Sequence, residues 1–174
     1  MFKKFTFSNQ LSKEQEIEIV LKNIHDVCHS IDNKEFAELN LCDYAYETEE
    51  AIKELGLEKE LIDQLLEDYV AQVLKNIELF EKYIAKLKVL SAKREKGPLR
   101  ESDYQELREL AHKNLGVARN LRIKDGEKIL KILHKSENIE TLELALKLLE
   151  AFAIKLKPNC AYNTLNLIKI KSSF

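Results

Sequence analysis

Apolar side chains recur at every third or fourth position through most of this chain. That spacing places them on one face of an α-helix and is typical of amphipathic helices that pack against a core. The longest such stretch begins near residue 58 and meets no helix-breaking residue before Gly97 and Pro98. Its apolar positions are Leu61, Ile62, Leu65, Leu66, Tyr69, Val70, Val73, Leu74, Ile77, Phe80, Ile84 and Leu87. The pattern therefore predicts one long helix in this part of the sequence.

The N-terminal part of the chain contains two shorter helical patterns. The first helix is predicted to begin at Ser12, because Ser12 and Gln15 have the spacing of a capping box ahead of apolar residues at helical spacing. It is predicted to end near Ser30. A second short helix is predicted from Thr48, where acidic residues follow the cap, to Gly56, a typical residue after a helix end. Between these two helices, residues 34–47 fit either a short helix or an extended stretch.

Two more helices are predicted after the long one. Ser102 and Gln105 have the spacing of another capping box, which predicts a helix that runs through His112 to about Leu121. Residues 125–135 repeat the helical period and predict the next helix.

A fourth helix and a tail complete the pattern. Ser136 is predicted to cap the helix and Pro158 to end it, whereas residues 158–174 fit either a last short helix or a strand-like strap. Amphipathic helices joined by short loops predict an all-α fold, an antiparallel four-helix bundle with additional N-terminal helices. We expect an N-terminal helical extension over residues 1–47, the bundle over residues 48–157, and a C-terminal tail.

Glycine and proline are scarce, with four glycines and two prolines among 174 residues, against a combined average of about 12%. Tight hairpins, Gly-rich phosphate-binding loops and βα turns need residues that accept unusual backbone angles. The composition therefore excludes most β and α/β architectures. The chain length fits a single domain.

Charge and cysteine content indicate the class of partner and the compartment. The 28 Lys and Arg residues nearly balance the 30 Asp and Glu residues, for a net charge of −2, so no basic field marks a nucleic-acid binder. No apolar run reaches the roughly 18 residues that a membrane span requires. Cys28, Cys42 and Cys160 are odd in number and widely spaced, which favours reduced thiols. We therefore expect a cytoplasmic protein that binds neither nucleic acid nor a membrane.

The helix predicted around His112 presents that residue to solvent. At about 100° per residue, Leu107, Ala111 and Ala118 fall on one side of the helix, and His112 and Gly116 fall nearly opposite. Gly116 lies one turn beyond His112, in the helix interior, where glycine costs roughly 1 kcal/mol relative to alanine. A helix retains such a glycine where another surface must approach closely. The pair therefore indicates a partner that docks over an exposed imidazole.

The stretch LRELAHKNLGVARNLRI, residues 107–123, resembles the active-site helix of histidine-containing phosphotransfer domains. In that family the phosphorylated histidine follows an alanine and precedes a glycine by four positions, as His112 follows Ala111 and precedes Gly116 here. The long helix before this stretch and the two helices after it are similar to the family's order, so the resemblance covers about residues 48–157. It implies a four-helix bundle of the histidine phosphotransfer type.

The resemblance also implies a function in a two-component phosphorelay. His112 would carry a phosphoryl group between receiver domains of response regulators, with a receiver or a hybrid histidine kinase as partner. The chain would then be a phosphoryl carrier rather than a multiple-turnover enzyme. An imidazole nitrogen attacks the acyl phosphate of a receiver aspartate and later passes the phosphoryl group on. Mg²⁺ belongs to the receiver, so the resemblance implies no cofactor and no metal on this chain.

Two positions depart from the family's pattern. The lysine three positions after the histidine is Leu115 here, and the usual leucine two positions after it is Asn114. Arg108, Lys113 and Arg119 lie on or near the face of the histidine and are candidates to neutralise a phosphate through charge-assisted hydrogen bonds. A plainer interpretation takes these three cations as a solvated helix face.

Two other functions stay open at the level of sequence. The chain would be a non-phosphorylated adaptor if it uses the same face only to bind a receiver or kinase domain. It would be an unrelated helical interaction module if His112 is an ordinary surface residue and its spacing from Gly116 is accidental. Phosphate transfer to His112 separates the carrier from both alternatives.

The remaining histidines suggest no second chemistry. His25 and His29 lie one turn apart, a spacing that can hold zinc with Cys42 as a third ligand. The sequence supplies no convincing fourth ligand, and Cys28 continues the apolar face, so we expect surface histidines beside a core cysteine and no metal. His134, near a predicted helix end, is interpreted as a surface residue or one placed for the helix dipole.

Overall fold

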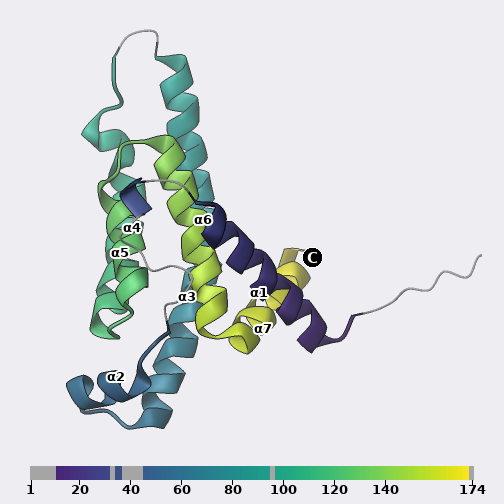
Figure 1. Ribbon diagram of the computed structural model, residues 1–174. Helices are drawn as coiled ribbons and strands as arrows, with labels where there is room; N and C mark the ends of the chain where they lie inside the picture. The colour runs from purple at the N-terminus through teal and green to yellow at the C-terminus, as the bar shows by residue number, and fades with distance from the viewer. Residues whose placement is uncertain (1–10, 32–33, 37–44, 95–96, 173–174) are drawn as a thin grey trace, which may run out of the picture.

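The computed structural model describes residues 11–31, 34–36, 45–94 and 97–172, and the regular structure in those ranges is entirely helical (Figure 1). The prediction of an all-α fold is confirmed. None of the helices in these ranges is long and apolar enough to cross a lipid bilayer. In chain order the elements are α1 (Lys13–Ser30), the 3₁₀ turn η1 (Lys34–Phe36), α2 (Thr48–Leu55), α3 (Lys59–Lys93), the 3₁₀ turn η2 (Glu101–Tyr104), α4 (Gln105–Asn120), α5 (Lys124–Lys135), α6 (Ile139–Leu156) and α7 (Pro158–Ser172).

Helices α3, α4, α5 and α6 pack as a ring around the core. Helix α3 contacts α4 and α6, and α5 contacts the same two helices. Each of the four runs opposite to the one before it (Figure 1). Full burial of one large apolar side chain contributes roughly 1.5–3 kcal/mol, so the inward faces of these helices hold the fold together. Their fully buried side chains include Leu74, Phe80, Leu87, Leu107, Ile129, Leu130, Leu133, Leu142, Leu148 and Leu149.

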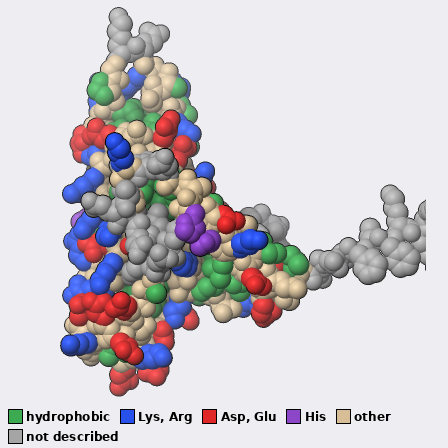
Figure 2. Space-filling view, in the orientation of Figure 1, with side chains coloured by type: hydrophobic (Ala, Val, Ile, Leu, Met, Phe, Trp, Pro, Cys, Tyr) green, Lys and Arg blue, Asp and Glu red, His purple; other side chains and the backbone are tan. Residues whose placement is uncertain are grey.

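The other helices lie at one end and on one side of this ring. Helix α2 packs on α3 at the lower end, where acidic side chains gather (Figure 2). Helix α1 packs on α6 and α7, and α7 packs on α3 and α6, so the tail takes the helical form of its two predicted alternatives. In the stretch where a short helix or an extended segment was expected, Lys34–Phe36 forms the turn η1, and residues 37–44 lie outside the described residues.

Predicted helix boundaries are confirmed where a cap residue makes the expected bond. Ser12 Oγ accepts a hydrogen bond from the Gln15 N–H at 3.3 Å, and the Gln15 side chain accepts one from the Ser12 N–H at 2.9 Å, which completes the predicted capping box. Gly56 follows α2 with a φ of 65°, a left-handed conformation that glycine adopts without strain. Helix α3 continues to Lys93, as its unbroken apolar period predicts.

The predicted capping box at Ser102 is wrong. The turn η2 occupies this position instead. The Asp103 carboxylate accepts a hydrogen bond from the Arg100 N–H at 2.7 Å and pairs with Arg94 at 2.9 Å. These contacts hold the chain in a tight 3₁₀ turn, and the α-helix begins only at Gln105.

The predicted cap of α6 at Ser136 is also wrong. Asn138 caps this helix, because its Oδ1 accepts a hydrogen bond from the Thr141 N–H at 3.0 Å. Ser136 Oγ accepts a hydrogen bond from the Asn138 N–H at 3.3 Å. Ser136 therefore stabilises the turn that leads into the helix, and the asparagine beside the first helical residue takes the cap position.

An arginine adopts the left-handed conformation in the turn between α4 and α5. Arg122 has a φ of 60°. Its N–H donates to the Arg119 carbonyl at 3.2 Å, and the Ile123 N–H donates to the Ala118 carbonyl at 2.9 Å, the two bonds of a Schellman helix end. The Arg122 side chain pairs with Glu54 of α2 at 2.6 Å. This turn reverses the chain within three residues and lays α5 against α4.

Asp125 is a buried acid near the start of α5. It is 3% exposed, and its Oδ2 atom has no hydrogen-bond partner. Burial raises the pKa of this carboxyl, although Lys128 and Lys155 oppose the rise. A carboxyl with a raised pKa in the folded protein costs stability as pH rises above its unfolded pKa of about 4.

We therefore expect Asp125→Asn to raise the free energy of unfolding at pH 7 by on the order of 1 kcal/mol. This increase in the free energy of unfolding should vanish at about pH 3, where Asp125 is protonated in both the folded and the unfolded state. Urea unfolding of both proteins at the two pH values measures the difference. An equal gain at both pH values would show that ionisation of Asp125 is not its cause.

Candidate functional site

His112 lies on the outer face of α4 and is exposed, as its place on the predicted helix indicates. The inner face of the same helix buries Leu107, Ala111, Leu115 and Ala118. These apolar contacts fix the rotation of the helix about its axis. The imidazole therefore stands on a rigid support rather than on a loop.

The α4–α5 hairpin brings a second histidine to His112. The ring centroids of His112 and His134 are 5.7 Å apart, and the ring planes are inclined at 42°. Closer to the turn, Arg119 of α4 contacts Glu127 of α5 at 3.2 Å. Residues at matching distances from the turn therefore face each other across the two antiparallel helices. His134 is partly buried by this packing.

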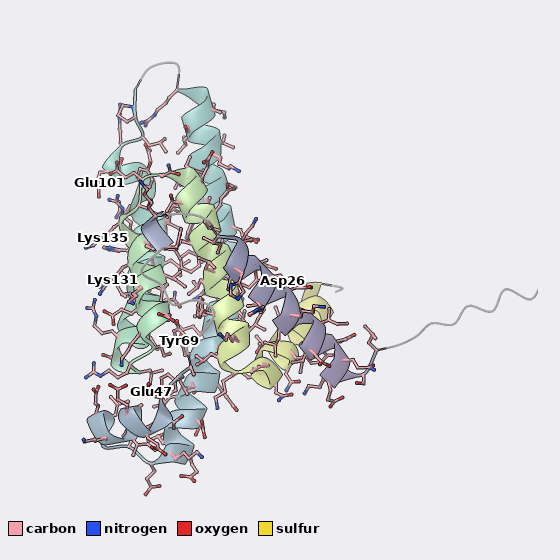
Figure 3. The ribbon with its side chains drawn as sticks, in the orientation of Figure 1. Asp26, Glu47, Tyr69, Glu101, Lys131 and Lys135 are labelled. Atoms are coloured by element: carbon pink, nitrogen blue, oxygen red, sulfur yellow. The ribbon has the colours of Figure 1, made fainter. Side chains whose placement is uncertain are left out.

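Both rings line an open surface hollow of about 600 Å³, which we call the His112 hollow. The hollow lies at the edge of the molecule where Figure 3 labels Glu101 above Lys135 and Lys131. The hollow is open to solvent, so a folded partner can reach the rings, but a small substrate would not be enclosed. The residues that line it are Glu101, Ser102, Gln105, Arg108, Glu109, His112, Lys113 and His134.

Arg108 forms one wall of the His112 hollow. Its guanidinium lies 5.1 Å from the centroid of the buried Tyr104 ring, and the Tyr104 hydroxyl donates a hydrogen bond to the Glu137 carbonyl at 3.1 Å. Arg108 also pairs with the side chains of Glu101 and, at 3.6 Å, Glu137. Its own side chain is 17% exposed, whereas those of the two glutamates are 77% and 69% exposed. Such exposed partners contribute little energy, so packing holds this cation in place.

The other predicted site residues lie at different positions along α4. Lys113 lines the His112 hollow. Gly116 is exposed outside the hollow, and nothing lies within 4 Å of the position that a side chain there would occupy. Arg119 is about two turns from His112, also outside the hollow, and it bonds Glu127. Of the three cations predicted to assist a phosphate, the structure thus brings Arg108 and Lys113 to the histidine.

Asn114 and Leu115, the two positions that depart from the family's pattern, are buried on the inner face of α4. Leu115 is 7% exposed and Asn114 is 1% exposed. The Asn114 amide group donates a hydrogen bond to the Leu110 carbonyl at 2.9 Å, and its Oδ1 accepts one from Asn76 of α3 at 3.4 Å. Asn114 therefore finds the hydrogen-bond partners that a buried amide requires. Neither position supplies a cation beside the histidine.

The charges around His134 affect its protonation. Burial lowers the pKa of this imidazole, and the positive charges of His112, Arg108 and Lys135 lower it further. A histidine with a lowered pKa is neutral at pH 7. Its ring then offers one hydrogen-bond donor and one acceptor.

The histidine pair on α1 has no such surroundings. The His25 and His29 rings lie 4.2 Å apart, edge to face, and both residues are exposed. Cys28 between them is buried, and Cys42 lies outside the described residues. In the part of the chain that the structure describes, no group of three His, Cys, Asp or Glu side chains could hold a metal ion.

A more enclosed cavity of about 300 Å³ lies between α3, α5 and α6, near the start of α2. Its wall includes Tyr69, labelled in Figure 3. Two of its charged residues, Asp63 and Lys157, pair with each other at 2.8 Å. Among the described residues that line this cavity there is no histidine, cysteine or serine. The His112 hollow is therefore the better candidate for chemistry.

His134 was expected to be a surface residue or one placed for the helix dipole, and its contact with His112 was not predicted. The spacing indicated this contact, because each of the two histidines stands eleven residues from Ile123, one before it and one after it. A tight turn at that point pairs them as soon as the helices are antiparallel. Comparison with protein-family models, curated proteins and solved structures finds no match to this chain.

Proposed function

We propose that this protein carries a phosphoryl group on His112 as an intermediate of a two-component phosphorelay. The observation that carries the proposal is an exposed imidazole on a rigid helix, in an open hollow with Arg108, Lys113 and a second imidazole. An open hollow suits a phosphoryl donor that is itself a folded domain. The ring of four antiparallel helices supports the resemblance to histidine phosphotransfer domains.

The proposed reaction is an in-line transfer between a receiver aspartate and His112. The lone pair of one ring nitrogen forms the N–P bond while the P–O bond to the aspartate breaks, and the electron pair of that bond stays with the aspartate carboxylate. The proton on the other ring nitrogen is then lost from the ring. The receiver supplies the carboxylate and Mg²⁺, and this chain supplies the nucleophile and its cationic surroundings.

Positive charge at the His112 hollow favours the arrival of the phosphoryl group. Arg108 and Lys113 line the hollow, and a doubly charged phosphoryl group is a stronger partner for Arg108 than the exposed glutamates that it now contacts. Lys and Arg side chains also follow the α4–α5 edge of the molecule (Figure 2). This edge would attract an acidic receiver surface and increase the rate of association.

The test is phosphate uptake from a phosphorylated receiver domain in the presence of Mg²⁺. The wild type should gain acid-labile phosphate, and His112→Gln should gain none, because glutamine has no nucleophilic nitrogen. His25→Gln is the matched control, since it removes an exposed histidine from α1 and should leave uptake unchanged. Uptake that survives in His112→Gln would disprove the assignment.

The buried Leu115 favours a second function, in which the same face binds a receiver or kinase domain without transfer. The cation that normally neutralises the phosphate is missing from this position, and Leu115 is only 7% exposed. The adaptor would be supported if the wild type binds a receiver but takes up no phosphate. In that case Gly116→Arg, which fills the open space on α4, should weaken the binding.

A further inference from the structure

His134 has no role in the transfer as described above, yet its ring lies beside the reacting ring. The two centroids are 5.7 Å apart, and both rings line the same hollow. A phosphoryl group on a ring nitrogen of His112 adds three acceptor oxygens beyond the edge of that ring. With the centroids this close, oxygens that project beyond the edge of the His112 ring come within hydrogen-bond reach of the His134 ring.

We infer that His134 is a second phosphate-binding residue of this site, whose imidazole hydrogen-bonds the phosphoryl group on His112 and takes up a proton when that group arrives. The inference rests on the proposed function and deepens it. It assigns to α5 the part that the resemblance gives to a lysine on α4, a position that the buried Leu115 occupies here. His134 is thus a positioning and charge-neutralising residue, and His112 remains the nucleophile.

The surroundings of His134 are suited to the uptake and release of a proton. In the resting protein burial keeps His134 neutral, and the neighbouring charges of Arg108 and Lys135 add to this effect. Lys113 adds positive charge to the hollow. Two exposed side chains, Glu101 and Glu109, add negative charge to it. Lys and Arg stay charged and Glu stays ionised near pH 7, so these side chains form a constant background of charge around His134.

The negative charge of the phosphoryl group favours the protonated form of His134. An opposite charge within about 4–6 Å shifts a pKa by one to three units towards the charged form. His134 therefore gains a proton as the phosphoryl group arrives, and this gain matches the proton that the His112 ring loses on forming the N–P bond. Transfer to the next receiver removes the negative charge and releases the proton from His134.

Chemical phosphorylation with potassium phosphoramidate tests this inference without any receiver. The His112 nitrogen attacks the reagent's phosphorus, the reagent's P–N bond breaks, and ammonia leaves. The full-length chain is used with His25→Gln and His29→Gln, so that the two rings of the hollow dominate the histidine signals. Nitrogen-15 NMR follows the protonation of His134 between about pH 6 and 9, and phosphorus-31 NMR follows the second ionisation of the phosphoryl group.

We expect the pKa of His134 to rise by about one to three units when His112 is phosphorylated. In His134→Gln, the second ionisation of the phosphoryl group should move to higher pH, because the neighbouring positive charge is lost. Lys131→Gln is the matched control, since Lys131 is a cation of the same helix that pairs with Glu127 and does not line the hollow, and it should leave that ionisation nearly unchanged.

An unchanged His134 pKa after phosphorylation of His112 would overturn the inference. Phosphate found only on His134, or on neither ring, would overturn it as well. Failure of the proposed function looks different: a receiver would then transfer no phosphate, while the chemically phosphorylated protein would still show the coupled titration.

Discussion

Leu74→Ala is expected to lower the free energy of unfolding by about 3 to 5 kcal/mol. Leu74 lies in the middle of α3 and is 2% exposed, so truncation removes buried apolar surface and leaves a cavity inside the ring of four helices. The neighbouring helices are packed on both sides and close such a cavity only in part. Because domains of this size are stable by about 5 to 15 kcal/mol, the loss is a large part of the total. Urea unfolding followed by circular dichroism measures it.

Leu61→Ala is the matched control, with the same substitution in the same helix. Leu61 is 44% exposed, so its truncation removes much less buried surface and should cost less than about 1 kcal/mol. Equal losses for the two leucines would contradict the placement of Leu74 at the centre of the ring.

Gly126→Ala is expected to lower the free energy of unfolding by about 1 to 3 kcal/mol, the usual cost of overpacking. A Cβ atom at this position would stand 2.8 Å from the Tyr69 hydroxyl and 3.0 Å from Cγ2 of Ile123. Tyr69 is 4% exposed, and because its ring is rigid, relief of the contact requires the whole ring to shift towards the neighbouring cavity. The clash therefore outweighs the roughly 1 kcal/mol by which alanine favours a helix over glycine.

Gly116→Ala is the matched comparison and should raise the free energy of unfolding by about 0.5 to 1 kcal/mol. Nothing lies within 4 Å of the added atom, so only the gain in helix propensity remains. Thermal unfolding of both variants checks the opposite signs. If Gly116 gives clearance to a docked receiver, the same variant should take up phosphate more slowly than the wild type, although it is more stable.

The helices could be predicted from the sequence because their apolar period is long and continuous. The period of α3 continues without a breaker, and the structure carries that helix to Lys93. The helix caps predicted at Ser102 and Ser136 were wrong, because in each case a nearby side chain makes the backbone hydrogen bond instead. Asp103 bonds the backbone ahead of α4, and Asn138 stands directly before α6. Which of several nearby side chains bonds the backbone depends on distances in the folded protein, and these cannot be obtained from the amino-acid sequence.

The candidate site was predictable where it depends on one helix alone. The 3.6-residue period was enough to place His112 and Gly116 on the exposed face of α4. The partners of these residues come from other elements, and one helix cannot reveal them. His134 approaches from α5, and the amide that pairs with Asn114 belongs to Asn76 of α3. Arg119 was expected at the histidine, but its contact with Glu127 holds it nearer the turn.

The turn at Arg122 has a consequence for the order of folding. The residues that line the His112 hollow fall between residues 101 and 134, so the chain closes only short loops to bring them together. Short loops cost little entropy, and contacts between near neighbours form early in helical proteins. The hairpin of α4 and α5 should therefore assemble the two imidazoles before α1 docks against α6 and α7. Sequence changes in α1 would then alter the stability of the protein without disturbing the register of its histidines.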